Sequence, residues 1–180
     1  MTDVSTDIEE LLRQFIVFED LEIGEYDSIA SAIERHPVEA GEDLITAGEV
    51  SRELFGLIDG RVEVIKRGDD QVWRLAVLEP YAVLGELGFV LGEPRTATVR
   101  AVDELEVWRL NGEMFDELAD AHVEAARAIE DNIIRMMAQR QVQTNREMLE
   151  LMRRADEDAE EYHTDEESDF GEQLMRRWTV

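Results

Sequence analysis

Between Val38 and Leu110 the sequence is a series of short runs rich in β-branched residues, cut at close intervals by glycine-bearing turns. Strand-length runs with turns this closely spaced are typical of a small antiparallel sandwich or barrel. Within Leu57–Ile65, apolar residues alternate with polar ones, which indicates a strand with one buried face. This pattern predicts an antiparallel β-roll, or jelly-roll (double-stranded β-helix), over residues 37–110.

Helical patterns flank the predicted roll on both sides. Apolar residues recur at helical spacing from Ile8 to Phe18 and, more weakly, from Tyr26 to Ile33. After the roll, Met114–Ala155 contains no glycine or proline, and a break near His122 is compatible with its pattern. The sequence therefore predicts an α+β domain over residues 1–155. We place N-terminal helices within 7–36 and the long C-terminal helices within 113–155.

The second half of that C-terminal segment carries a heptad pattern. Its two apolar heptad positions are filled by Ile134, Gln141, Met148 and Ala155, and by Met137, Thr144 and Leu151. A polar layer inside such a seam is a device that sets the register of paired helices. The helix could pack back on its own domain or pair in parallel with a second copy. We favour a homodimer through the C-terminal helix.

Charge and composition exclude several classes of function. The 180 residues include 44 acidic and 18 basic side chains, which gives a net charge of −26. Such a surface repels nucleic acids and anionic lipids, because binding either one needs basic residues that neutralise phosphates. The chain has no cysteine, and its three histidines lie far apart, so we predict neither a metal site nor a catalytic set.

Targeting signals are also missing from the sequence. The N-terminus is acidic and has no apolar core of a signal peptide, and no apolar run approaches the roughly 20 residues of a membrane span. We therefore expect a cytoplasmic protein without a membrane anchor.

The C-terminal stretch has two parts of different character. Residues 156–168 hold many acids and no base, which predicts an acidic disordered linker over 156–169. The final residues could place four apolar side chains on one face of a short helix, beside Arg176 and Arg177: Phe170, Leu174, Met175 and Trp178. Residues 170–180 are either a frayed or back-folded tail, or a docking tail (Phe170–Val180) for a protein partner.

The stretch Gly85–Val99, GELGFVLGEPRTATV, resembles the cyclic nucleotide-binding domain family. This family includes the catabolite activator protein, the regulatory subunits of cyclic-nucleotide-dependent kinases and cyclic-nucleotide-gated channels. Gly-Glu-Leu, a short apolar turn and Pro-Arg-Thr-Ala-Thr-Val match its cassette without insertion. The resemblance runs from about Phe18 to about Arg154 and implies cAMP or cGMP as the ligand. One departure is Glu79–Ala82, where the family commonly has a glycine in the turn.

The chemistry of the cassette suits a cyclic phosphate. Arg95 offers a planar fork of donors to two phosphate oxygens, and the turn at Leu87–Leu91 would add N–H groups of a helix N-terminus. Gly85 and Gly88 permit close approach of the backbone. Glu86 could accept a hydrogen bond from the ribose 2′-hydroxyl. The predicted ligand-binding residues are Gly85, Glu86, Leu87, Gly88, Arg95, Thr96 and Thr144.

The base of the nucleotide is less constrained than its phosphate. Kinase domains of the family that this chain resembles have Arg-Thr-Ala-Thr where they bind cGMP. Arg95–Thr98 has the same pattern. Bacterial activators have a serine at the position of Thr96 and use cAMP, towards which we lean as the commoner bacterial signal. Contacts to the base would come from the long helix, with Thr144 and Arg140 as candidates.

Two functions remain open. The first is a stand-alone sensor, in which the nucleotide acts through the C-terminal helix and the tail on a protein partner. The second is a ligand-free structural or adaptor protein with the same fold. Bacterial activators of the family carry a DNA-binding helix-turn-helix after this helix. Too few residues follow Ala155 for a further domain of roughly 50 residues, so we expect no DNA binding. Because the sequence shows no catalytic set, we also expect no enzyme activity.

Overall fold

The computed structural model describes residues 4–68 and 71–162. The chain divides into two compact units, residues 1–137 and 138–180, and each is considered by itself. The helices are α1 (Val4–Leu12), the 3-10 helix η1 (Ile16–Phe18), α2 (Ile23–Ala32), α3 (Glu86–Leu91), α4 (Gly112–Ala121) and α5 (Val123–Tyr162). The strands are β1 (Glu34–Val38), β2 (Asp43–Ile45), β3 (Glu53–Asp59), β4 (Val62–Arg67), β5 (Val72–Leu78), β6 (Val83–Leu84), β7 (Thr98–Ala101) and β8 (Leu105–Asn111).

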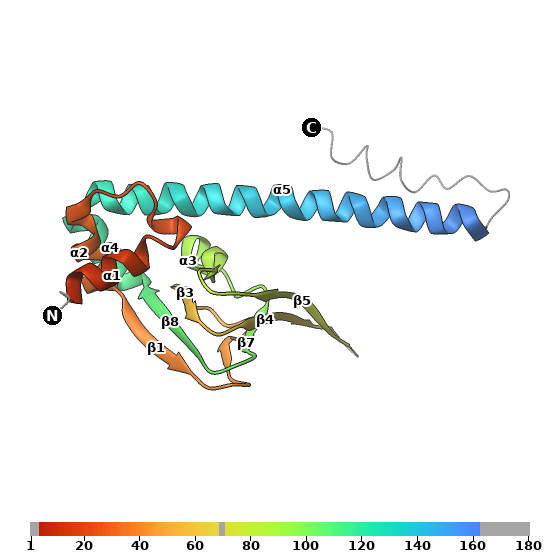
Figure 1. Cartoon of the computed structure of the whole chain (residues 1–180), viewed down its shortest axis with the longest axis horizontal. Coiled ribbons are helices and arrows are strands. Elements are labelled where there is room, and N and C mark those ends of the chain that lie inside the picture. Colours follow the sequence, from red (N-terminus) through yellow and green to blue (C-terminus); the bar gives the residue numbers. More distant parts are fainter. Residues whose placement is uncertain (1–3, 69–70, 163–180) are drawn as a thin grey trace. The chain divides into compact units, whose positions relative to one another are not determined.

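Within the described residues, the strands form two four-stranded sheets, in the orders β1-β8-β3-β6 and β2-β7-β4-β5. Every strand pair is antiparallel. Figure 1 shows α1, α2 and α4 gathered at one end of the strands, with the β4–β5 hairpin extending at the other. The predicted class, an α+β fold built on an antiparallel β-roll with flanking helices and a long C-terminal helix, is confirmed.

Two hydrophobic cores hold the first unit together. One lies inside the roll and includes Phe55, Leu57 and Val107, which point inward from alternating positions of β3 and β8. The other joins the helices to the outer face of the sheet and includes Phe15, Phe18 and Trp108. Adjacent residues of β8 therefore serve different cores, because successive side chains of a strand point to opposite faces.

Three boundaries differ from the sequence-based ones or refine them. β1 begins at Glu34, inside the range assigned to helices, because it pairs with β8 from Glu34 opposite Arg109 onward. The C-terminal segment breaks at His122, between α4 and α5. α5 continues to Tyr162, so residues 156–162 are helical, in contrast to the disordered linker predicted over 156–169. Alanine and glutamate favour a helix even where like charges accumulate.

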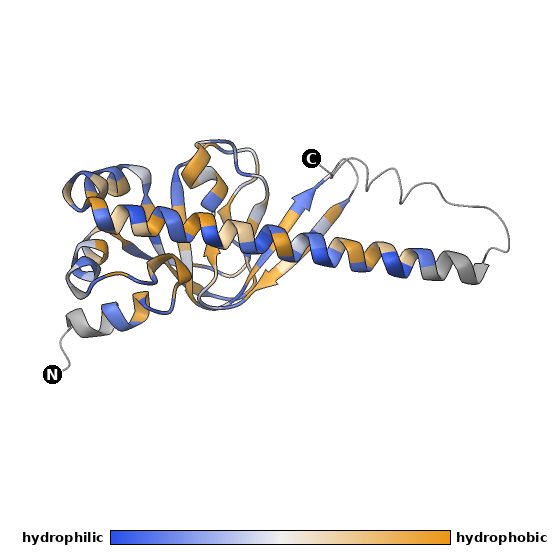
Figure 2. Ribbon diagram, turned by 90° about the horizontal axis from the view of Figure 1, so that it is seen from above, coloured by the Kyte–Doolittle hydropathy of each residue, from blue (hydrophilic) through white to orange (hydrophobic). Residues whose placement is uncertain are grey.

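Residues 163–180, which contain the rest of that linker and the predicted docking tail, lie outside the described residues. In the second unit, the described residues 138–162 form the distal part of α5. Apolar side chains are exposed along it, including Met148 and Leu151 at the two predicted seam positions. Figure 2 shows hydrophobic and hydrophilic residues interspersed along this helix. Its predicted seam therefore has apolar surface to offer. Within the described part of the chain, no helix has the length and apolarity needed to cross a membrane.

An ion pair between β7 and β2 should make stability depend on pH in the acid range. Arg100 donates two hydrogen bonds to Asp43, at 2.6 and 3.1 Å, and these hold the pKa of the carboxyl below its usual value. A carboxyl whose pKa is lower in the folded state stabilises the fold above its unfolded pKa of about 3.9. This contribution disappears as the pH falls through the lower, folded-state pKa.

We therefore expect Asp43→Asn to reduce the free energy of unfolding at pH 6 by about 1 kcal/mol or less. The difference from the unmodified protein should shrink as the pH is lowered to 3, and urea titrations at a series of pH values measure it. Asp103→Asn is the matched comparison: a hydrogen bond from Arg61 lowers the pKa of Asp103 too, so it should show the same trend with pH, but a smaller one because that pair is more exposed. A difference for Asp43→Asn that stays equal at pH 6 and pH 3 would contradict the assignment.

Candidate functional site

The predicted cassette forms a short helix between two glycines. Gly85 is the N-cap of α3 with φ 83°, and Gly92 is its C-cap with φ 66°. Both values lie in the left-handed region, which is unfavourable for residues other than glycine. The N–H of Phe89 donates the first bond of the helix to the carbonyl of Gly85, at 3.0 Å. The N–H groups of the first turn have no acceptor within a helix, so this end of α3 can receive an anion.

Arg95 lies behind this turn, and only 6% of its surface is exposed. Its guanidinium donates to the carbonyl of Gly85 and to the carbonyl of Glu53, each at 2.7 Å. Its Nε and Nη2 both donate to the hydroxyl of Ser51, at 3.1 and 2.7 Å. The main chain of Arg95 holds the same loop, because its N–H donates to the carbonyl of Glu49 and its carbonyl accepts from Gly48. The arginine thus joins α3, β3 and the loop before β3.

The two glycines of the cassette make room for this guanidinium. A Cβ atom at Gly85 would lie 2.5 Å from Nη1 of Arg95, and a Cβ at Gly88 would lie 2.8 Å from it. The sequence predicted that these glycines permit close approach of the backbone to a phosphate. In the described structure, the group that approaches them is Arg95 itself.

Arg95 is a charged side chain in a buried position, where charged groups are uncommon. Burial lowers the pKa of the guanidinium from its usual value, and the negative charges of Glu53, Glu86 and Glu49 oppose that shift. An arginine stays protonated even so, because a guanidinium is too strong a base to lose its proton in a protein. The site therefore holds a permanent buried cation with carboxylates around it. A single negative charge can be recognised there with little solvent competition.

The other predicted residues differ in their burial and in the unit to which they belong. Glu86 opens α3 and, like Leu87, is half-buried, whereas Thr96 is exposed directly after Arg95. Thr144 is exposed on the distal part of α5, in the second unit. The structure thus brings Gly85, Glu86, Gly88 and Arg95 together in the first unit.

Sequence reasoning missed Ser51 and the carbonyl of Glu53. Both bind Arg95 across more than forty positions of sequence, at separations of 44 and 42 residues. No motif around Ser51 marks it, and a main-chain carbonyl has no signature in the sequence. Only the packing of β3 against the cassette could reveal them.

The turn that precedes the cassette keeps a glycine-like conformation without a glycine. Tyr81 has φ 73°, one of two non-glycine residues with positive φ in the described part of the chain. Its N–H donates to the carbonyl of Leu57 at 2.7 Å, and its ring lies 5.7 Å from that of Phe15. These contacts can offset the cost of about 1–3 kcal/mol for such a backbone. The backbone at Tyr81 therefore adopts a conformation that is typical of glycine, although the turn contains none.

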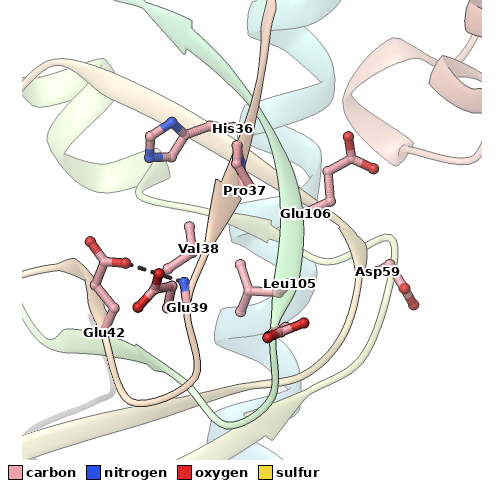
Figure 3. A pocket seen from close by; sticks show the side chains of 9 residues that line it. His36, Pro37, Val38, Glu39, Glu42, Asp59, Leu105 and Glu106 are labelled. Carbon is pink, nitrogen blue, oxygen red and sulfur yellow. Dashed lines mark hydrogen bonds between the residues drawn. The ribbon is translucent and has the colours of Figure 1, made fainter.

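The structure also has a hollow that none of these site residues lines. A pocket of about 770 Å³ is lined by His36, Pro37, Val38, Glu39, Glu42, Asp59, Glu104, Leu105 and Glu106 (Figure 3). It contains none of the predicted site residues, and its five carboxylates would repel a phosphate. In the described parts of the chain, no three His, Cys, Asp or Glu side chains are placed to hold a metal ion.

Comparisons with known proteins bear on the family and the fold of the chain. Residues 35–122 match the family model described as "Cyclic nucleotide-binding domain". A crystal structure of a cyclic nucleotide-binding domain from Methylobacillus flagellatus superposes with a TM-score of 0.72 and 19% identity, over 81% of this chain and 83% of that one. The regulatory domain of Toxoplasma gondii PKA, crystallised with cAMP, gives a TM-score of 0.60 and 26% identity, over 69% of this chain and 48% of that one.

Among curated proteins, the chain is similar to an uncharacterised NTE family protein of Mycobacterium tuberculosis. The two are 29% identical over 134 residues, which is 74% of this chain. The match covers 22% of that relative's length, so the chain spans about a fifth of the curated proteins it matches.

Proposed function

Residues 35–122 of this chain form a domain of the cyclic nucleotide-binding family, and on that premise we propose that the chain is a regulatory module that binds cAMP or cGMP. The observation that carries the proposal is the buried cation of Arg95 directly behind the first turn of α3. Arg95 and the first-turn N–H groups receive the cyclic phosphate, and Glu86 accepts a hydrogen bond from the ribose. The PKA regulatory domain to which the chain is similar was crystallised with cAMP.

The high negative charge of the chain does not oppose this role. The Debye length is about 8 Å at physiological salt, so distant surface carboxylates contribute little to the potential at a buried site. Arg95 and the end of α3 determine the local potential. Thr96 is exposed next to Arg95 and can reach a phosphate or a base. Thr144 and Arg140 stay sequence-based predictions for contacts with the base. The domain works by binding, and we propose no catalytic role for it.

The output of the module is a protein contact. The C-terminal helix has two arrangements, and the nucleotide shifts the equilibrium towards the one that it binds more tightly. The size of this shift is set by the difference between the two affinities. α5 is one helix of 40 residues with exposed apolar side chains on its distal part, which suits a homodimer seam. The tail Phe170–Val180 is the proposed contact with a further protein.

Titration calorimetry with cAMP and cGMP tests the proposed function. We expect saturable binding of at least one of them, with 5′-AMP as a control ligand that has the same base and an open, more highly charged phosphate. Thr96→Ala should weaken cGMP more than cAMP if its hydroxyl contacts the guanine. Light scattering on the same samples reports whether the chain is a dimer. Absence of binding at millimolar concentrations of both cyclic nucleotides would refute the proposed function.

One observation favours the ligand-free adaptor as a second candidate. In the described structure, the side chain of Arg95 donates four hydrogen bonds that all end on groups of the protein, so four of its five N–H donors are bonded without a nucleotide. An adaptor would capture its partner equally well with and without nucleotide. Deletion of residues 170–180 would abolish that capture. Capture that depends on nucleotide would favour the sensor instead.

A further inference from the structure

The hydroxyl of Ser51 occupies one whole edge of the Arg95 guanidinium. A single oxygen accepts from both Nε and Nη2, at 3.1 and 2.7 Å. These are two adjacent donors of the fork, the arrangement with which arginine binds an anion in a bidentate manner. A neutral hydroxyl is a weaker acceptor for them than a charged phosphate oxygen.

The remaining bonds of Arg95 are much harder to exchange. Nη1 donates to the carbonyl of Gly85 and Nη2 donates to that of Glu53. Gly85 caps α3, and Glu53 begins β3, which pairs with β8 from this residue onward. The carbonyls of Gly85 and Glu53 can be separated from Arg95 only if the end of α3 and a central strand move. An anion that binds the fork therefore takes the place of Ser51.

The next residue, Arg52, connects the same loop to α4. Its carbonyl accepts from the N–H of Gly112, the first residue of α4, at 2.7 Å. Its Nη1 pairs with Asp116 of α4 at 2.6 Å, and its Nε donates to the carbonyl of Phe89 in α3 at 3.3 Å. A Cβ at Gly112 would lie 2.6 Å from Cδ of Arg52, so the two residues are in close contact. Displacement of this loop must alter the start of α4.

We propose that Ser51 is a positioning residue that holds the phosphate-binding edge of Arg95 in the ligand-free domain, and that Arg52 transmits its displacement to α4. The proposal rests on the function proposed above and names the residues through which that site is regulated. Ser51 competes with the nucleotide for the same two donors. Its release on binding loosens the contacts that Arg52 makes with Gly112 and Asp116.

Substitution of Ser51 tests the competition. Ser51→Ala leaves two buried donors unsatisfied only in the ligand-free state, so it should lower the melting temperature of the free protein and tighten binding of cAMP or cGMP about tenfold. Ser51→Thr retains the hydroxyl and should restore the unmodified affinity. Ser31→Ala is the control. It removes a serine hydroxyl that donates to the carbonyl of Asp27 in α2, and it should change neither the melting temperature nor the nucleotide affinity. Unchanged or weakened binding by Ser51→Ala would overturn the proposal.

Hydrogen exchange measures the transmission step. Nucleotide should increase exchange of the amides at the start of α4 in the unmodified protein, and Arg52→Lys should abolish that increase while binding persists. Arg61→Lys, in the bidentate pair with Asp103, is the matched control and should leave the increase intact. In the ligand-free protein, Ser51→Ala should by itself raise exchange at these amides, a result that needs no nucleotide.

The two proposals fail in different ways. If the unmodified protein binds neither nucleotide, the proposed function is refuted, and the ligand-free exchange of Ser51→Ala decides whether Ser51 and α4 are linked. If the unmodified protein binds but α4 exchange does not respond, the inference alone is overturned.

Discussion

Arg95→Ala is expected to abolish nucleotide binding and to destabilise the domain at the same time. The substitution removes four hydrogen bonds and leaves the carbonyls of Gly85 and Glu53 without their charged donor. Hydrogen bonds to charged groups contribute about 1.5–3 kcal/mol each, and loss of a buried charge partner costs about 3–5 kcal/mol. We expect the free energy of unfolding to fall by about 3 kcal/mol and the nucleotide affinity by at least about a hundredfold.

Two further variants separate the binding role of Arg95 from its structural role. Arg95→Lys keeps the positive charge but lacks the planar fork, so it should recover part of the stability and little of the affinity. Arg100→Ala removes an arginine of the following strand, β7, whose partner is Asp43. It should leave the affinity unchanged. Urea denaturation and calorimetry supply both quantities. An Arg95→Ala protein that is folded and binds nucleotide normally would refute the assigned role.

Gly56→Ala is expected to prevent the domain from folding cooperatively. A Cβ atom at this position would lie 2.0 Å from Cε2 and 2.1 Å from Nε1 of Trp108. Gly56 pairs directly with Trp108 across β3 and β8, so the indole lies over the backbone where a methyl group would project. Phe15 and Phe18 hold the indole on its other sides, with ring centroids 5.2 and 5.1 Å away. The ring therefore has little room to move.

Overpacking usually costs about 1–3 kcal/mol, but here the clash involves a fully buried indole, so we expect a loss above about 4 kcal/mol. Near-ultraviolet circular dichroism and thermal melts measure the outcome. Gly24→Ala in α2 is the control, because a Cβ at Gly24 would meet no atom within 4 Å. That control should be neutral or slightly stabilising. A normal melting transition for Gly56→Ala would mean that Trp108 does not lie as described.

The fold class was predictable because it depends on local patterns. The closely spaced glycine turns and the alternation within Leu57–Ile65 indicate strands, and the long stretch without glycine or proline before Ala155 indicates helix. The start of β1 was not predictable, because four of its five residues are exposed and show no alternation of polar and apolar side chains. Its pairing with β8 comes from a partner some seventy residues away.

Some residues of the candidate site were also predictable from the sequence, and others were not. Gly85, Glu86, Gly88 and Arg95 lie close in sequence, so one motif contains them all. Ser51 and the carbonyl of Glu53 carry no motif, and both became visible only as the partners of Arg95. Sequence reasoning explained the two glycines by the approach of a ligand. The structure explains them by the approach of the arginine.

The sequence by itself determined the β-roll, its flanking helices and the position of the cassette, because turn residues, alternation and helix propensity act between near neighbours. The tertiary structure alone decided the state of Arg95. A guanidinium has the same donors wherever it lies, and the sequence cannot say which acceptors surround it. Folding places Ser51, the end of α3 and the start of β3 around Arg95, and these contacts set its burial, its pKa and the edge that a phosphate must take over.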